Sequence, residues 1–161
     1  MHLKTFLKLL IFGVFKKTTK MENILRPHHF AITVSNYVET INWYQQKLGF
    51  KTESEFERKD LGSKIAFLSL NGIFLEIFYF QDSQDLPEYR KSLISDLKVQ
   101  GLKHFAFVVK DIKAKVLELK ALGVEFVLEP TLGGAGHFYA FFKDNNGTLL
   151  ELFEESSFNS K

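Results

Sequence analysis

The sequence predicts an α+β fold of two tandem modules, each a strand, a helix and three further strands. Two observations point to it. The segments His-Phe-Ala-Ile-Thr-Val from His29 and His-Phe-Ala-Phe-Val-Val from His104 start 75 residues apart. The segments Leu-Glu-Ile-Phe around Glu76 and Leu-Glu-Leu-Phe around Glu151 are also 75 residues apart. One internal repeat therefore places metal-type ligands on equivalent strands, which predicts a metal site on a pseudo-two-fold axis.

The first module is expected over residues 24–80. Residues 28–34 are rich in Phe, Ile and Val and read as a strand. Ser35 or Asn36 can cap the helix that follows, and Gly49 is a natural C-terminal stop. Three strands follow, with Asn71-Gly72 as a tight hairpin between the last two; they are expected over residues 50–57, 64–70 and 73–80.

The second module is expected over residues 102–155 and has the same order. Residues 103–109 form its first strand, Asp111 caps its helix and Gly123 ends that helix. Its three closing strands are expected over residues 125–128, 138–143 and 148–153.

Residues 81–101 are expected to link the two modules. Within them Asp85-Leu-Pro-Glu88 resembles a capping box that opens a short helix. The linker could cover the mouth of a cavity, or it could be a plain solvated connector.

Composition narrows the possible functions. The chain has 161 residues, enough for one domain, and a net charge of +2. No basic stripe is interleaved with aromatic residues, so we expect no nucleic-acid partner. The 18 Phe imply a bulky core or an aromatic-lined cavity. The chain has no Cys, which excludes thiolate metal sites and fits a reducing cytoplasm.

Residues 1–20 differ from the rest of the chain, and we expect them to be an extension outside the fold of residues 21–161. The apolar stretch over residues 6–15 is too short to span a bilayer. No small-residue cleavage site follows it. Met21 is then the favoured natural start, ahead of a surface membrane anchor and of a cleaved signal peptide.

Glu76 and Glu151 are the sharpest signals for chemistry. Apolar residues flank each of them on both sides, so both faces of each strand are expected to be covered. An unpaired carboxylate in such a place costs several kcal/mol, so it needs a cation, a proton or hydrogen-bond donors. Two such glutamates at equivalent positions of a repeat favour a shared cation.

His29 and His104 each head a strand face of smaller side chains. Strand alternation places His29, Ala31 and Thr33 on one face. Two neutral imidazoles and two carboxylates would neutralise one divalent ion and suit Zn²⁺, Ni²⁺, Fe²⁺, Mn²⁺ or Co²⁺.

These segments resemble the vicinal oxygen chelate superfamily, which contains glyoxalase I, extradiol dioxygenases and antibiotic-resistance proteins. Besides the repeated His and Glu segments, the resemblance is carried by Trp43-Tyr44, by Leu48-Gly-Phe50 and by the segment Phe-Lys-Asp-Asn-Asn-Gly that ends at Gly147. It implies paired βαβββ modules that form a cup-shaped mixed sheet around one metal. It also implies that His29, Glu76, His104 and Glu151 are the ligands, in the glyoxalase I-like pattern.

The resemblance further implies a metal-dependent lyase or isomerase that acts on a small molecule with vicinal oxygens, by proton transfer at a metal-bound carbonyl. Glu151 is the implied base and Glu76 its pseudo-symmetric alternative. A homodimer is expected, and the ligands then come from one chain or from two. The alternatives are an Fe(II) extradiol-type dioxygenase and a non-catalytic small-molecule binding or resistance protein.

Three residues are expected to determine substrate specificity. Bacterial glyoxalase I has an arginine where this chain has Thr33 and an asparagine where it has Phe80, so recognition of glutathione in the usual way is not expected. His137 follows a glycine-rich loop and could contact substrate, although an exposed loop histidine without a role is the alternative.

Overall fold

The structure is a computed structural model that describes residues 26–154. The extension predicted over residues 1–20 lies outside the described residues. The first module contains, in order, β1 (His29–Val34), α1 (Tyr37–Leu48), β2 (Lys51–Arg58), β3 (Ser63–Leu70) and β4 (Ile73–Phe80). The second contains β5 (Phe105–Val109), α3 (Ile112–Ala121), β6 (Phe126–Leu132), β7 (Phe138–Lys143) and β8 (Leu149–Glu154).

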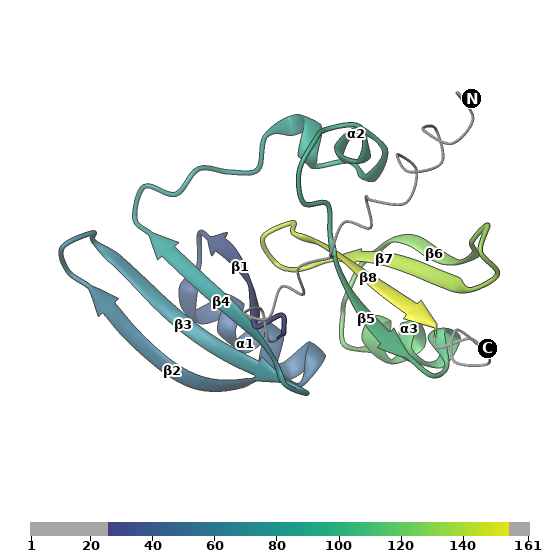
Figure 1. The fold of residues 1–161 in the computed structure, drawn as a ribbon, viewed down its shortest axis with the longest axis horizontal. Helices are drawn as coiled ribbons and strands as arrows, with labels where there is room; N and C mark the ends of the chain where they lie inside the picture. Colours follow the sequence, from purple (N-terminus) through teal and green to yellow (C-terminus); the bar gives the residue numbers. More distant parts are fainter. Residues whose placement is uncertain (1–25, 155–161) are drawn as a thin grey trace, which may run out of the picture.

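The predicted α+β fold of two tandem βαβββ modules is confirmed (Figure 1). Each module forms its own four-stranded mixed sheet, in the orders β1-β4-β3-β2 and β5-β8-β7-β6. In each sheet the first strand runs parallel to the last and the other pairs are antiparallel. The two sheets therefore repeat the same topology, as the 75-residue repeat requires.

Local sequence signals set the helix ends. The Asn36 side chain accepts a hydrogen bond from the Glu39 backbone N–H at 3.3 Å, which makes Asn36 the N-cap of α1. Asp111 caps α3 in the same way through the Ala114 N–H, at 2.9 Å. Gly49 ends α1 at a φ of 76°, a left-handed conformation that costs glycine little.

One hydrophobic core joins the two modules. The helix-covered face of each sheet contributes to this core, which includes Leu75 and Ile77 from β4 and Leu150 and Leu152 from β8. Rings from both modules also meet there, since the Phe30 and Phe105 centroids lie 3.7 Å apart. The opposite face of each sheet is left outside this core, as the exposure of every second residue of β1 shows.

A buried hydrogen bond ties α1 to the second module. The Tyr44 hydroxyl donates to the Asp144 carboxylate at 2.9 Å, and both side chains are buried. Asp144 also accepts from the backbone N–H groups of Asn146 and Thr148, at 2.9 and 2.8 Å. Burial raises the pKa of Asp144 above its ordinary value, and it raises the pKa of Tyr44 as well.

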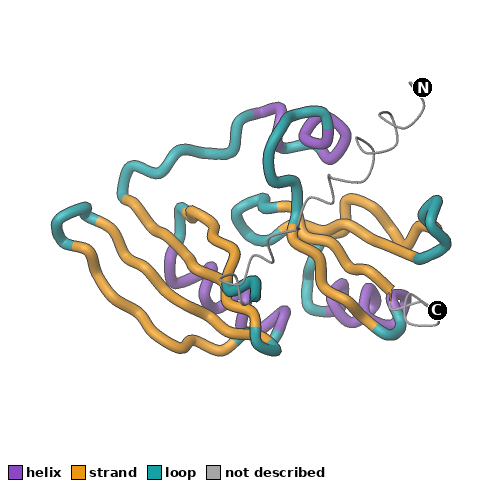
Figure 2. Tube along the Cα trace, viewed as in Figure 1, coloured by secondary structure: helices purple, strands orange, loops and turns teal. Residues whose placement is uncertain are grey.

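The linker contains a 3₁₀ turn, η1 (Glu88–Arg90), and the short helix α2 (Leu93–Leu97), between longer stretches of loop (Figure 2). The capping box predicted at Asp85 is wrong: the residue before the first helical turn is Pro87, and no side chain caps that turn. Proline offers no N–H and fixes its own backbone, so the chain stays extended until Glu88.

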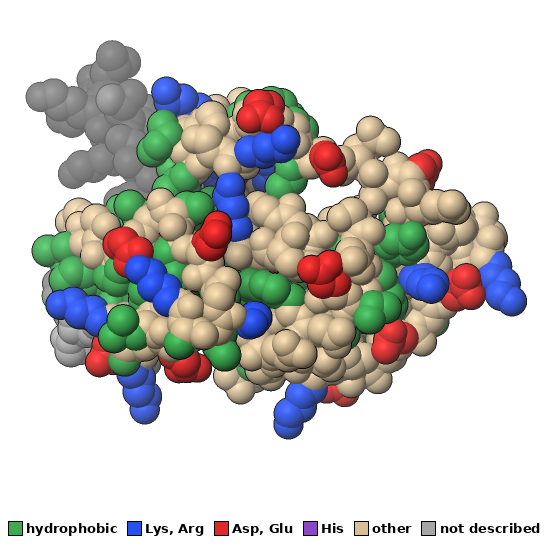
Figure 3. Space-filling model, turned by 180° about the vertical axis from the view of Figure 1, so that it is seen from behind, with side chains coloured by type: hydrophobic (Ala, Val, Ile, Leu, Met, Phe, Trp, Pro, Cys, Tyr) green, Lys and Arg blue, Asp and Glu red, His purple; other side chains and the backbone are tan. Residues whose placement is uncertain are grey.

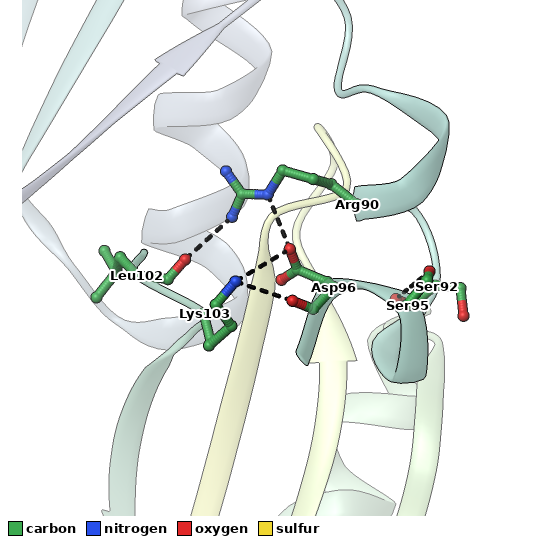
Figure 4. Close-up of polar contacts among 6 residues, drawn as sticks. All are labelled: Arg90, Ser92, Ser95, Asp96, Leu102 and Lys103. Carbon is green, nitrogen blue, oxygen red and sulfur yellow. Dashed lines mark hydrogen bonds and ion pairs between the residues drawn. The ribbon is translucent and has the colours of Figure 1, made fainter. Parts of the chain in front are cut away.

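Asp96 on α2 anchors the linker (Figure 4). Its carboxylate is 2 % exposed and accepts from Nε of Arg90 at 3.0 Å, with Nζ of Lys103 at 3.6 Å. Arg90 also donates to the Leu102 carbonyl and Lys103 to the Asp96 carbonyl, so these contacts close the linker into a compact unit.

None of the helices in the described part of the chain has the length and hydrophobicity needed to cross a membrane. On the face seen from behind, basic and acidic side chains are interspersed (Figure 3).

Candidate metal centre

The first half of the predicted site lies on the outward face of the first sheet. His29 begins β1 and Glu76 sits in the middle of β4, with Nε2 of His29 3.3 Å from Oε2 of Glu76. The imidazole is 41 % exposed and the carboxylate side chain 15 %. His28 also lies here: its Nδ1 is 2.9 Å from Nδ1 of His29, and its ring stacks on Phe74. His28 was not among the predicted site residues, although its place next to His29 in the sequence was a visible signal.

The second half repeats this arrangement on the second sheet. Nε2 of His104 lies 2.9 Å from Oε2 of Glu151 on β8. Nδ1 of His104 is buried and has no hydrogen-bond partner within residues 26–154. Burial raises the pKa of the Glu151 carboxyl, while His104 and His137 act in the opposite direction. A half-buried carboxylate and a half-buried imidazole are thus held against each other in a place where water solvates neither fully.

Both pairs have a spacing that suits two ligands of one ion. Metal–ligand distances of about 2.1 Å place neighbouring ligand atoms about 3.0 Å apart at a right angle and about 3.4 Å apart at a tetrahedral angle. The observed separations are 3.3 and 2.9 Å. The residues present therefore fit a divalent ion, with Nε2 and a carboxylate oxygen from each pair as donors.

The structure does not bring the two pairs together within one chain. Among residues 26–154 no group of three or more His, Asp or Glu side chains is close enough to hold one metal ion. The physical reason is the shared core: the modules meet through their helix-covered faces, and the pairs lie on the opposite faces. One chain thus presents two half-sites rather than a tetrad.

Each half-site has an aromatic ring at an equivalent position of its sheet. His29 meets Phe67 edge-on, with centroids 5.9 Å apart, and His104 meets Phe141 edge-on at 5.0 Å. Phe67 pairs in register with Glu76, and Phe141 pairs with Glu151. From the sequence, the 18 Phe implied only a bulky core or an aromatic-lined cavity. Their common place beside a glutamate is visible once the strand registers are known.

The residues expected to determine substrate specificity lie around these half-sites. Thr33 is exposed on the same face of β1 as His29. Phe80 is half-buried and its ring stacks on Phe78, with centroids 6.4 Å apart. The His137 ring centroid lies 4.4 Å from that of Phe153 on β8, and the pKa of Glu151 is sensitive to its charge.

A separate cavity of about 640 Å³ lies beneath the linker, between the two modules. Residues of β1, of the linker and of the turn before β8 line it. His104 is the only one of the four predicted ligands among its lining residues. The linker therefore covers a cavity, but that cavity does not contain either His–Glu pair.

The topology and the repeated His–Glu pairs define a protein of paired βαβββ modules with two equivalent half-sites. The sequence pattern of the Glyoxalase/Bleomycin resistance protein/Dioxygenase superfamily matches residues 26–152. The chain belongs to this superfamily.

Relatives and solved structures agree with this assignment. The chain is 36% identical over 132 residues to YwkD, an uncharacterized protein of Bacillus subtilis (strain 168), covering 80% of this chain and 95% of that protein. It matches the structure of a glyoxalase family protein from Enterococcus faecalis with a TM-score of 0.70 and 33% identity, over 80% of this chain and 97% of that one. Glyoxalase I from Zea mays shares the fold, with a TM-score of 0.66 and 22% identity, over 82% of this chain and 45% of that one.

Proposed function

We propose that the protein is a divalent-metal-dependent lyase or isomerase of the glyoxalase type. Its substrate would be a small molecule with vicinal oxygens, and its chemistry a proton transfer next to a carbonyl. The observation that carries the proposal is the pair of equivalent His–Glu contacts, at 3.3 and 2.9 Å, each on an outward sheet face and each with the spacing of two ligands of one ion.

The complete centre would form between two copies of the chain. Each copy has two proposed ligands on the outward face of each of its two sheets. In a two-fold dimer, the first-module face of each copy can meet the second-module face of the other, which makes two equivalent sites. His29 and Glu76 of one copy would then meet His104 and Glu151 of the other. This arrangement supplies four ligands to each ion, as the fold of one chain alone does not.

The chain's own residues have distinct roles in this proposal. When bound, a divalent ion would polarise a substrate carbonyl and lower the cost of negative charge on it. Glu151 would take the proton from the neighbouring carbon and return it to the adjacent position, with Glu76 as the alternative base. Phe141 pairs with Glu151 across β7 and β8 and would exclude water beside it. The lack of Cys leads us to propose a reducing compartment such as the cytoplasm.

Metal titration tests the centre directly. We expect isothermal titration with Zn²⁺ or Ni²⁺ to give about one ion per chain. Glu76→Gln and Glu151→Gln should each weaken binding at least about tenfold, since each removes a charged ligand. Glu118→Gln, an exposed change on α3, is the matched control and should bind as the unaltered protein does. Full metal affinity in both glutamate variants would contradict the proposal.

Activity assays separate the enzyme classes. We expect weak or no turnover of methylglyoxal with glutathione, because Thr33 and Phe80 stand where glyoxalase I of bacteria has its glutathione-binding groups. Rapid turnover would show that other residues bind glutathione. Oxygen consumption with a catechol and Fe²⁺ would instead favour a dioxygenase.

A further inference from the structure

The strand registers sort the outward faces into rows of side chains that lie beside the proposed ligands. The glutamate row of the first sheet runs across the strands as Ala31, Glu76, Phe67 and Ser54. The glutamate row of the second sheet runs as Ala106, Glu151, Phe141 and Leu128. Apart from the glutamates themselves, neither row contains a charged residue.

The next row, toward the C-terminal ends of β1 and β5, is uncharged and largely apolar. In the first sheet this apolar row comprises Thr33, Phe78, Ile65 and Phe56. In the second sheet it comprises Val108, Phe153, Tyr139 and Thr131. Phe56 is 44% exposed and Val108 65%, so much of this surface is open in one chain.

Neighbouring aromatic rings in these rows contact one another in pairs. Phe56 lies nearly parallel to Phe67, with an interplanar angle of 19° and centroids 6.5 Å apart. In the second sheet Tyr139 and Phe141 meet edge-on at 5.7 Å. Stacked and edge-on arrangements at these distances are the ones aromatic pairs prefer, and a flat apolar ligand could extend both.

The side chain nearest to the apolar rows that can carry a positive charge is His137, whose ring centroid lies 4.4 Å from that of Phe153 in the second sheet. The lysines and the arginine lie on the borders of the rows. Lys51 lies in the row of His29, on the opposite side of the glutamate row. Lys143 donates to the Lys91 carbonyl at 2.5 Å. Arg58, beyond the apolar row, is paired with Asp60 at 2.7 Å. Over the apolar row of the first sheet, a substrate with an anionic tail would lose water and meet only Arg58, which is already paired with Asp60.

We infer that the substrate's vicinal oxygens are attached to a flat, aromatic or similarly apolar body without a second charge, which lies on the apolar rows beside the ligands. This inference rests on the proposed metal centre and adds the substrate class. In this proposal the aromatic rings contact the apolar body of the substrate. The glutamates of the neighbouring rows would hold the ion, and the ion would bind the vicinal oxygens.

Hydroxamic acids test this inference, because one bidentate head group can carry different bodies. We would titrate the Zn²⁺-loaded full chain with benzohydroxamic acid, acetohydroxamic acid and the monohydroxamic acid of succinic acid. Benzohydroxamate should bind at least about tenfold more tightly than acetohydroxamate, as burial of a phenyl ring allows. The succinic compound should gain nothing over acetohydroxamate.

Two variants locate the effect. Phe56→Ala removes an exposed ring with little demand on folding, and Phe67→Leu keeps apolar volume while removing the ring beside His29. Both should reduce the ratio of the benzohydroxamate affinity to the acetohydroxamate affinity at least about threefold. Leu117→Ala, at a residue 69% exposed on α3, is the control and should change neither.

The outcomes are distinguishable. Equal affinities for the benzo and aceto compounds, with normal Zn²⁺ uptake, would overturn this inference and leave the metal centre standing; the rings would then serve contact between copies only. Tighter binding of the succinic compound would also overturn it, in favour of an anionic substrate. Failure to take up Zn²⁺ would overturn the proposed function and this inference together.

Discussion

Two variants that each fail to bind metal as homodimers should bind metal when they form a mixed dimer. The first variant, His29→Ala with Glu76→Ala, loses the half-site of the first module. The second, His104→Ala with Glu151→Ala, loses that of the second module. Each variant alone should bind no metal tightly, because every site in its homodimer keeps only two of four ligands.

The expected recovery follows from the geometry of a two-fold dimer. Random pairing of the two variants makes about half of the dimers mixed, and each mixed dimer has one intact site and one that lacks all four ligands. The mixture should therefore bind about a quarter of the metal that the unaltered protein binds. A site within one chain would give none, because no chain in the mixture keeps all four residues.

The assay is co-expression of the two variants with different affinity tags, followed by tandem purification and metal analysis. The purified mixed dimer should contain one ion per dimer, half the content of the unaltered protein. The same two tags on two copies of the first variant provide the control. A mixed dimer without metal, or a single variant with full metal content, would refute the reasoning from two outward half-sites.

Three further predictions concern the contacts that hold the modules in place. Tyr44→Phe should cost about 2 kcal/mol, because it leaves the buried Asp144 carboxylate without one donor, and thermal unfolding should show a fall of about 4–8 °C; an unchanged midpoint would contradict the contact. Burial raises the pKa of Asp144, so the folded state holds its proton more tightly than the unfolded state, and this contribution to stability is lost as pH rises above the ordinary value. Asp144→Asn should therefore gain stability relative to the unaltered protein as the pH rises above about 4 in urea unfolding, and parallel pH profiles would show that this carboxyl is not perturbed. Asp96→Ala should cost about 3 kcal/mol, since Arg90 and Lys103 lose their buried partner, whereas Asp96→Asn should cost less; equal losses measured by urea unfolding would mean that charge is not what matters there.

The sequence predicted the fold well where the signals were local or repeated. The N-cap at Asp111 and the stop at Gly49 depend on single residues and their immediate neighbours, and both are where they were expected. Prediction failed at Asp85, where a capping pattern was present but the proline inside it delayed the helix. Val38 has the helical spacing of the buried residues Ile41 and Tyr44 of α1, yet it is 65% exposed, so spacing alone does not identify every buried residue of this helix.

The pairing of each histidine with its glutamate could be predicted within a module, but the separation of the two pairs could not. His29 and Glu76 lie on adjacent parallel strands, so the repeat and the strand order bring them close. Whether the second pair completes the same site depends on which faces of the two sheets meet. The hydrogen bond between Tyr44 and Asp144 is one of the contacts that join the modules, and its two residues are 100 apart in the chain.

The two modules, the strands and the His–Glu pairs could be predicted from the sequence. Strand alternation depends only on neighbouring residues, and the internal repeat can be seen directly in the sequence. Only the tertiary structure decided that the helix-covered faces share one core and that the half-sites point away from it. It also decided which rings lie beside the ligands. The physical reason is that face-to-face packing and strand register are long-range choices, made by the burial of apolar surface over the whole chain rather than by any one segment.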